Sequence, residues 1–148
     1  MQKAYNFAIF YFLLFSLLLL ISSSVLFASK IGFSSESVLT YYLGNEALFI
    51  APKTISGVLK VVLPHIFAFG LFVMVVVHFL LFTYKKRTRE IRLLTSAAFI
   101  LSFLEIFTPF AIMNGFESLA FLKILSFITF ELLIIYILWI LFRSSIHI

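Results

Sequence analysis

Five ionisable residues interrupt long apolar stretches of the sequence, and they are the groups that could do chemistry. They are His65, His78, Glu105, Lys123 and Glu131. Ionisable residues at membrane depth are costly, and they usually serve as ion pairs, proton relays or ligand sites. Histidine can bind a metal or carry a proton near neutral pH.

The two histidines lie 13 residues apart in one apolar stretch. On a helix this spacing separates them by about 20 Å along the axis and turns them about 140° from one another. Neutral imidazole is a good axial ligand for haem iron. Residues 64–70 and 77–79 resemble the histidine-bearing helices of membrane b-type cytochromes. That resemblance implies haem b on His65 and His78, with Gly70 admitting the edge of the porphyrin.

The number of ligands limits this hypothesis. The b-type pattern needs opposite ligands from a second helix, and the remaining histidine, His147, stands at the C-terminal end. A homodimer could pair the two histidine segments, or one haem could use His65 or His78 together with Met74 or a partner subunit. Alternatively, the histidines hydrogen-bond to neighbouring helices as packing residues, or they transfer protons.

A polar stripe surrounds the first carboxylate. Ser102, Glu105 and Thr108 are spaced three apart and share one helix face. Pro109 has no backbone N–H, so it frees the carbonyl of Glu105. Only a short link separates this segment from the next, which carries Lys123, so the two segments should be neighbours. We expect Glu105 and Lys123 to form an ion pair that holds the helices together.

Glu131 follows Lys123 by eight residues and has no evident cationic partner in the sequence. The functional alternatives for Glu131 are a proton relay and a contact with a quinone headgroup. The same alternatives apply to Glu105 and Lys123 if these two residues do more than form an ion pair.

The composition decides what kind of element carries these residues. About 64% of the 148 residues are apolar and only 11% are charged, whereas soluble domains are roughly half apolar and a quarter charged. A small domain cannot bury this excess of apolar residues away from water. The chain is therefore an integral membrane protein, and a soluble enzyme, a disordered chain and a nucleic-acid-binding module are excluded. The absence of cysteine excludes disulfides, thiol chemistry and cysteine-ligated cofactors within the chain.

Four apolar segments are each long enough to cross a bilayer as a helix, which takes about 20 residues. They span about 5–28, 57–83, 93–113 and 118–142. Bilayers favour helices, so the prediction is an all-α bundle in one domain, residues 1–148. The first segment could be a signal peptide, with Lys3 before its apolar core, but the length of that core favours an uncleaved helix.

Charge predicts the orientation of the bundle. The short loop 84–92 holds five positive residues and should face the cytoplasm, together with both termini. The chain should then lie in the plasma (inner) membrane of a bacterium. The longer loop 29–56 falls outside, where its Gly44-Asn45 turn and its tyrosines suit a short interfacial helix or a cap.

This loop carries Tyr41, Tyr42, Gly44, Pro52 and Lys53, and it resembles that of uncharacterised small four-helix bacterial membrane proteins. The resemblance implies architecture and no activity.

The leading hypothesis is a small redox-linked subunit that binds haem b and passes electrons between the quinone pool and a partner. It would act as a homo-oligomer or beside a larger membrane protein. One alternative is a non-enzymatic scaffold or assembly subunit, and another is a proton or small-ion conduit. We expect the chain to contact the lipid bilayer and not to bind nucleic acid.

Overall fold

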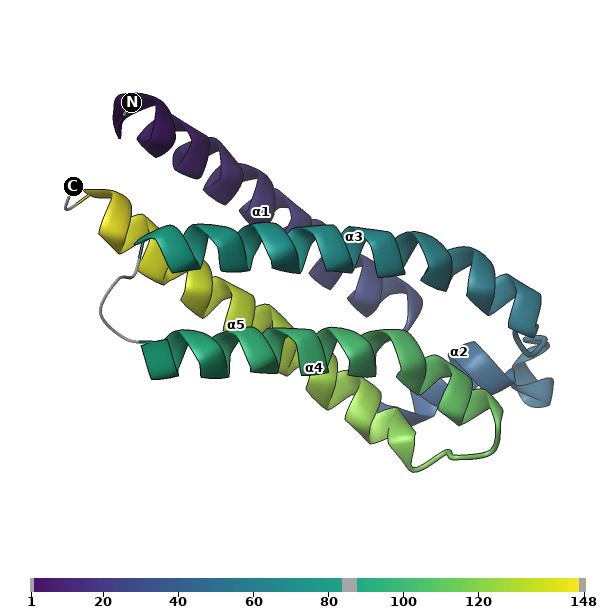
Figure 1. Ribbon diagram of the computed structural model, residues 1–148. Coiled ribbons are helices and arrows are strands. Elements are labelled where there is room, and N and C mark those ends of the chain that lie inside the picture. The colour runs from purple at the N-terminus through teal and green to yellow at the C-terminus, as the bar shows by residue number, and fades with distance from the viewer. Residues whose placement is uncertain (1, 84–87, 147–148) are drawn as a thin grey trace.

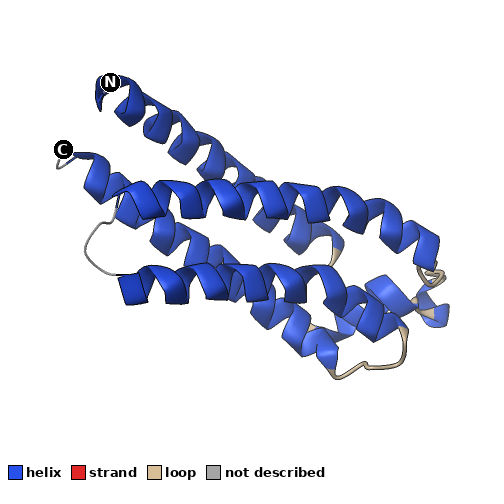
Figure 2. Ribbon diagram, in the orientation of Figure 1, coloured by secondary structure: helices blue, strands red, loops and turns tan. Residues whose placement is uncertain are grey.

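The computed structural model describes the backbone of residues 2–83 and 88–146, and the side chains of residues 7–82 and 89–144. Figure 2 shows that helices make up nearly all of this part of the chain. The elements are α1 (Gln2–Lys30), α2 (Ser35–Leu43), the 3₁₀ helix η1 (Glu46–Leu48), α3 (Ile55–Thr83), α4 (Thr88–Met113) and α5 (Leu119–Ile146). Four of them, α1, α3, α4 and α5, are long and apolar enough to span a membrane. The predicted fold class is confirmed.

The four long helices form a bundle in which α5 is the central member. α5 packs against α1, α3 and α4, and α2 packs across α4 and α5. Half of the most apolar window of α5 is buried (50%), against 17% for α3 and 22% for α1. Both chain ends lie at one end of the bundle, called here the terminus end, and α2 and η1 lie at the other, the α2 end (Figure 1). Which end faces the cytoplasm stays a prediction.

Two hydrophobic clusters fill the bundle. The cluster nearer the terminus end joins α1, α3, α4 and α5, and its buried members are all apolar. The cluster nearer the α2 end adds α2, through Val38 and Tyr42. Close packing of these side chains, rather than release of water, holds helices together within lipid. The α2 end therefore differs from the terminus end because a short surface helix closes it.

The expected short helix in the long loop is present as α2. Ser34 and Ser37 form a reciprocal capping box at its start, which satisfies backbone donors that have no partner in the first turn. Gly44 ends α2 with a φ of 78°, and a Cβ there would lie 2.5 Å from the carbonyl oxygen of Ile50. The turn predicted at Gly44-Asn45 thus needs glycine for both conformation and space.

Helix boundaries differ most at the start of α4. The apolar pattern predicts a start near residue 93, whereas the helix begins at Thr88. Four of residues 88–92 are polar or charged, and arginine and glutamate are good helix formers, so the helix continues beyond the apolar stretch. Its first turns also bury Ile91, which is 7% exposed. Apolarity marks the part of a helix that suits lipid, and it does not mark where the helix ends.

Candidate functional site

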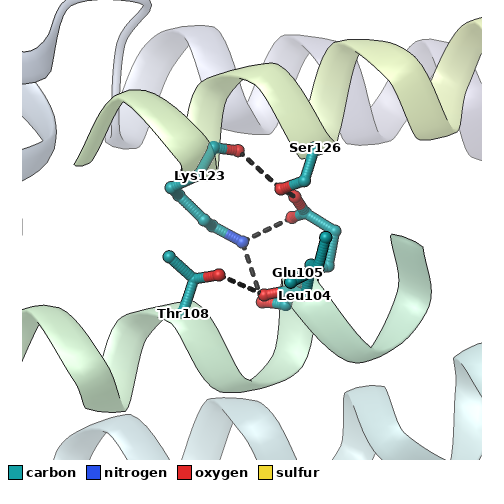
Figure 3. A network of polar contacts seen from close by, with 5 residues as sticks. All are labelled: Leu104, Glu105, Thr108, Lys123 and Ser126. Carbon is teal, nitrogen blue, oxygen red and sulfur yellow. Dashed lines mark hydrogen bonds and ion pairs between the residues drawn. The ribbon is translucent and has the colours of Figure 1, made fainter. Parts of the chain in front are cut away.

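A buried ion pair joins α4 to α5. The ammonium of Lys123 contacts the Glu105 carboxylate, and the two side chains are only 7% and 6% exposed. The hydroxyl of Ser126, one turn further along α5, donates a hydrogen bond to the other carboxylate oxygen. Figure 3 shows the three side chains converging between the helices. The ion pair expected from the short connection between the segments is present.

The Lys123 ammonium also contacts a backbone carbonyl of α4, and Pro109 explains why that carbonyl is free. Proline cannot donate to the carbonyl four residues before it, which is that of Glu105. The Lys123 ammonium takes the place of this donor, with its Nζ 2.9 Å from the Glu105 carbonyl oxygen (Figure 3). One lysine therefore neutralises the carboxylate and also satisfies the backbone group that the proline left without a partner.

The rest of the stripe on α4 is also buried. Ser102 and Thr108 are 6% and 4% exposed. Each hydroxyl donates to a carbonyl of its own helix, Ser102 to Ala98 and Thr108 to Leu104. These hydroxyls remain bonded within α4 and leave the ion pair to link the two helices. The common face expected from the spacing of three residues is confirmed.

The α2 helix closes over this site. Tyr42 is 6% exposed and belongs to the same cluster as Ile106 and Ile124. Burial raises the pKa of the Tyr42 phenol, and charge on Tyr41 and on Glu105 raises it further. The phenol therefore stays neutral to a higher pH than an exposed tyrosine would. Sequence reasoning missed Tyr42, because nothing in the loop indicates which helices α2 will cover.

Glu131 lies on α5 towards the middle of the bundle and is 8% exposed. Ser23 of α1 lies near its side chain. Two turns along α1, Ser16 is 2% exposed, and its hydroxyl has no hydrogen-bond partner among the described residues. Among the described residues, no ion pair to Glu131 is found, in contrast to Glu105.

The histidines lie elsewhere, on α3, and both are exposed. Nδ1 of His65 is 2.6 Å from the carbonyl oxygen of Val61, one turn back on the same helix. The His78 ring packs beside Phe79 and Phe82. Neither histidine approaches the ion pair through any contact found in the described residues.

The remaining haem-ligand candidates share the outer surface of α3. Met74 is 62% exposed, and a Cβ added to Gly70 would have open space within 4 Å. Axial ligands approach iron from opposite faces of the porphyrin, whereas Met74 and His78 are four residues apart and lie on one side of a helix. Among the described residues, no three histidine or acidic side chains gather as a metal site. His147 lies outside the described residues.

Comparison with known proteins identifies a family that is described by its architecture. Residues 32–147 match the model of a family described as a transmembrane helical domain. No curated protein and no solved structure matches the chain. Because the match covers more than half of the 148 residues, the chain belongs to this transmembrane helical domain family.

Proposed function

We propose that this member of the transmembrane helical domain family is a non-enzymatic scaffold, an assembly subunit of a larger membrane-protein complex. The supporting observation is the buried ion pair of Lys123 and Glu105, which also engages the Ser126 hydroxyl and the Glu105 carbonyl. A proton relay or ligand site needs polar groups that can exchange partners. These groups are instead used to hold α4 against α5.

The exposure of α3 supports docking of a partner. Only 17% of its most apolar window is buried, and His78 is exposed on it at membrane depth. Within the described residues the His78 ring has aromatic neighbours and no hydrogen-bond partner. A polar ring facing lipid is unfavourable, and an adjacent protein helix would supply the missing partner. The surface of α3 that carries Met74 and His78 is therefore the proposed docking face.

The packing argues against a proton or small-ion conduit within one chain. The described buried polar groups are Ser16, Ser102, Glu105, Thr108, Lys123, Ser126 and Glu131. The cluster nearer the terminus end consists of apolar residues of four helices. Between Ser16 and Glu131 and the terminus end, the buried side chains that the structure describes are all apolar. A conduit would therefore need an oligomer with a path between subunits.

Site-specific crosslinking in intact membranes tests the scaffold proposal. The chain has no cysteine, so Met74→Cys provides a single attachment point for a photoreactive maleimide on the docking face. Ile100→Cys on α4 is the matched control, since Ile100 is 60% exposed and Met74 62%. We expect Met74→Cys to form one discrete protein adduct of reproducible mass, and Ile100→Cys to form little or none.

Two results would count against the scaffold proposal. If both positions label only lipid, α3 has no protein partner. If both positions form the same adducts in equal yield, contact is random and the docking face is not specific. His78→Ala in the Met74→Cys background gives a further comparison: loss of the adduct ties docking to the histidine.

The exposed histidines favour one second candidate, haem b held between chains. His65 and His78 of two α3 helices could supply ligands from opposite faces, and such a subunit would pass electrons between the quinone pool and a partner. Protein purified from a haem-replete host would then be coloured and show a b-type reduced-minus-oxidised spectrum, lost in His65→Ala or His78→Ala. A flat spectrum from the intact oligomer would reject this candidate and leave the scaffold unaffected.

A further inference from the structure

An open pocket of about 400 Å³ lies at the α2 end, between the end of α1, helix α2 and the segment before α3. Its lining combines two cations, one acid, an aromatic ring and apolar side chains. The residues that matter here are Lys30, Glu36, Tyr41, Leu48, Ile50 and Lys53. None of them belongs to the ion-pair site or to the docking face of α3.

Both lysines stand where a membrane-crossing segment ends. Lys30 is the last residue of the span Phe7–Lys30, and Lys53 comes two residues before the span that begins at Ile55. The Lys53 Nζ lies 4.9 Å from the centre of the Tyr41 ring, and this cation–π contact holds the ammonium at the pocket. Since Glu36 is the only acid in the lining, the pocket carries net positive charge next to the ends of two candidate membrane spans.

An apolar tip adjoins the lysines. Leu48, Phe49 and Ile50 are 62%, 97% and 42% exposed. Phe49 has a φ of 55°, a left-handed conformation that a bulky residue rarely adopts. Reciprocal backbone hydrogen bonds between Asn45 and Ile50, at 2.8 and 2.9 Å, hold the turn closed around it. The loop therefore maintains an unfavourable backbone conformation that leaves the Phe49 ring exposed.

We propose that this pocket binds the phosphate of a phospholipid headgroup. Lys30 and Lys53 neutralise the phosphate, and the tip of Leu48, Phe49 and Ile50 packs against the acyl chains beside it. Basic side chains next to exposed apolar ones match the two halves of a phospholipid, whereas a soluble anion would use only the lysines. The inference does not depend on the proposed scaffold function.

Native mass spectrometry of the purified full chain, titrated with phosphatidylglycerol in mild detergent, tests this site. Lys30→Gln and Lys53→Gln each remove one charge. The matched control is Lys60→Gln, because Lys60 is an exposed lysine of α3 near the same end that does not line the pocket. A basic residue near a membrane surface contributes about 1 kcal/mol, so each pocket variant should bind about five-fold more weakly. The control should bind like the wild type.

Three comparisons decide the outcome. An equal loss in Lys60→Gln would show diffuse attraction to charge and overturn the site. Equal binding of a diacyl glycolipid without phosphate would overturn phosphate recognition. If inorganic phosphate alone binds as tightly as the lipid and displaces it, the ligand is free phosphate and the lipid assignment fails. A single, lysine-dependent phospholipid that phosphate displaces only at much higher concentration would support the proposal.

Discussion

Replacing Lys123 with methionine should strongly weaken the association of α4 with α5. Methionine keeps an unbranched side chain of similar length but removes the ammonium. The Glu105 carboxylate is then left 6% exposed with only the Ser126 hydroxyl as a partner, and the Glu105 carbonyl freed by Pro109 loses its donor. The variant therefore removes one partner of a buried pair without creating a large cavity.

The magnitude follows from those contacts. Removing one partner of a buried ion pair costs about 3–5 kcal/mol. Ser126 still stabilises the carboxylate, which favours the lower end, so we expect about 3 kcal/mol, or a roughly 150-fold shift towards the unfolded state. The double variant Glu105→Leu/Lys123→Met removes both charges. It should recover more than half of this loss, because no charge remains buried.

The assay is reversible unfolding of the purified chain by sodium dodecyl sulfate in mild detergent, followed by circular dichroism. Ser102→Ala is the control, since the Ser102 hydroxyl bonds only to the Ala98 carbonyl of its own helix, and we expect a loss below about 1 kcal/mol. The reasoning is refuted if Lys123→Met is no less stable than Ser102→Ala. It is also refuted if the double variant is as unstable as the single one.

Three further predictions concern the α2 end and the orientation. Gly44→Ala should cost about 2 kcal/mol locally, because φ 78° and ψ 178° suit only glycine and the added Cβ meets the Ile50 carbonyl; faster proteolysis of the loop with unchanged helix content would show it. Burial raises the pKa of Tyr42. The stability that the neutral phenol contributes is therefore complete below the unfolded pKa of about 10 and is lost at more alkaline pH. In thermal unfolding, Tyr42→Phe should lose less stability at alkaline pH than the wild type does. For orientation, an impermeant thiol reagent should label Glu117→Cys in intact cells and Arg143→Cys only after lysis, and the reverse pattern would invert the predicted topology.

Much of the candidate site followed from local spacing. Ser102, Glu105 and Thr108 share a face because three residues make nearly one helical turn, and Lys123 meets Glu105 because a short link makes their helices neighbours. Ser126, Tyr42 and Ser23 could not be assigned in this way. Tyr42 and Ser23 come from segments distant in the sequence, and Ser126 is one of several serines whose spacing alone does not select a partner.

By itself, the sequence determined that four segments are long and apolar enough to cross a membrane and that they are helical, and it left a short helix or a cap as alternatives for the loop between the first two. The physical reason is general: a bilayer requires long apolar segments with every backbone amide bonded internally. Only the tertiary structure decided that α5 is central, that α3 is exposed with both histidines and that α2 covers the ion pair. Lipid and protein core are equally apolar, so an apolar residue does not reveal which of the two it faces.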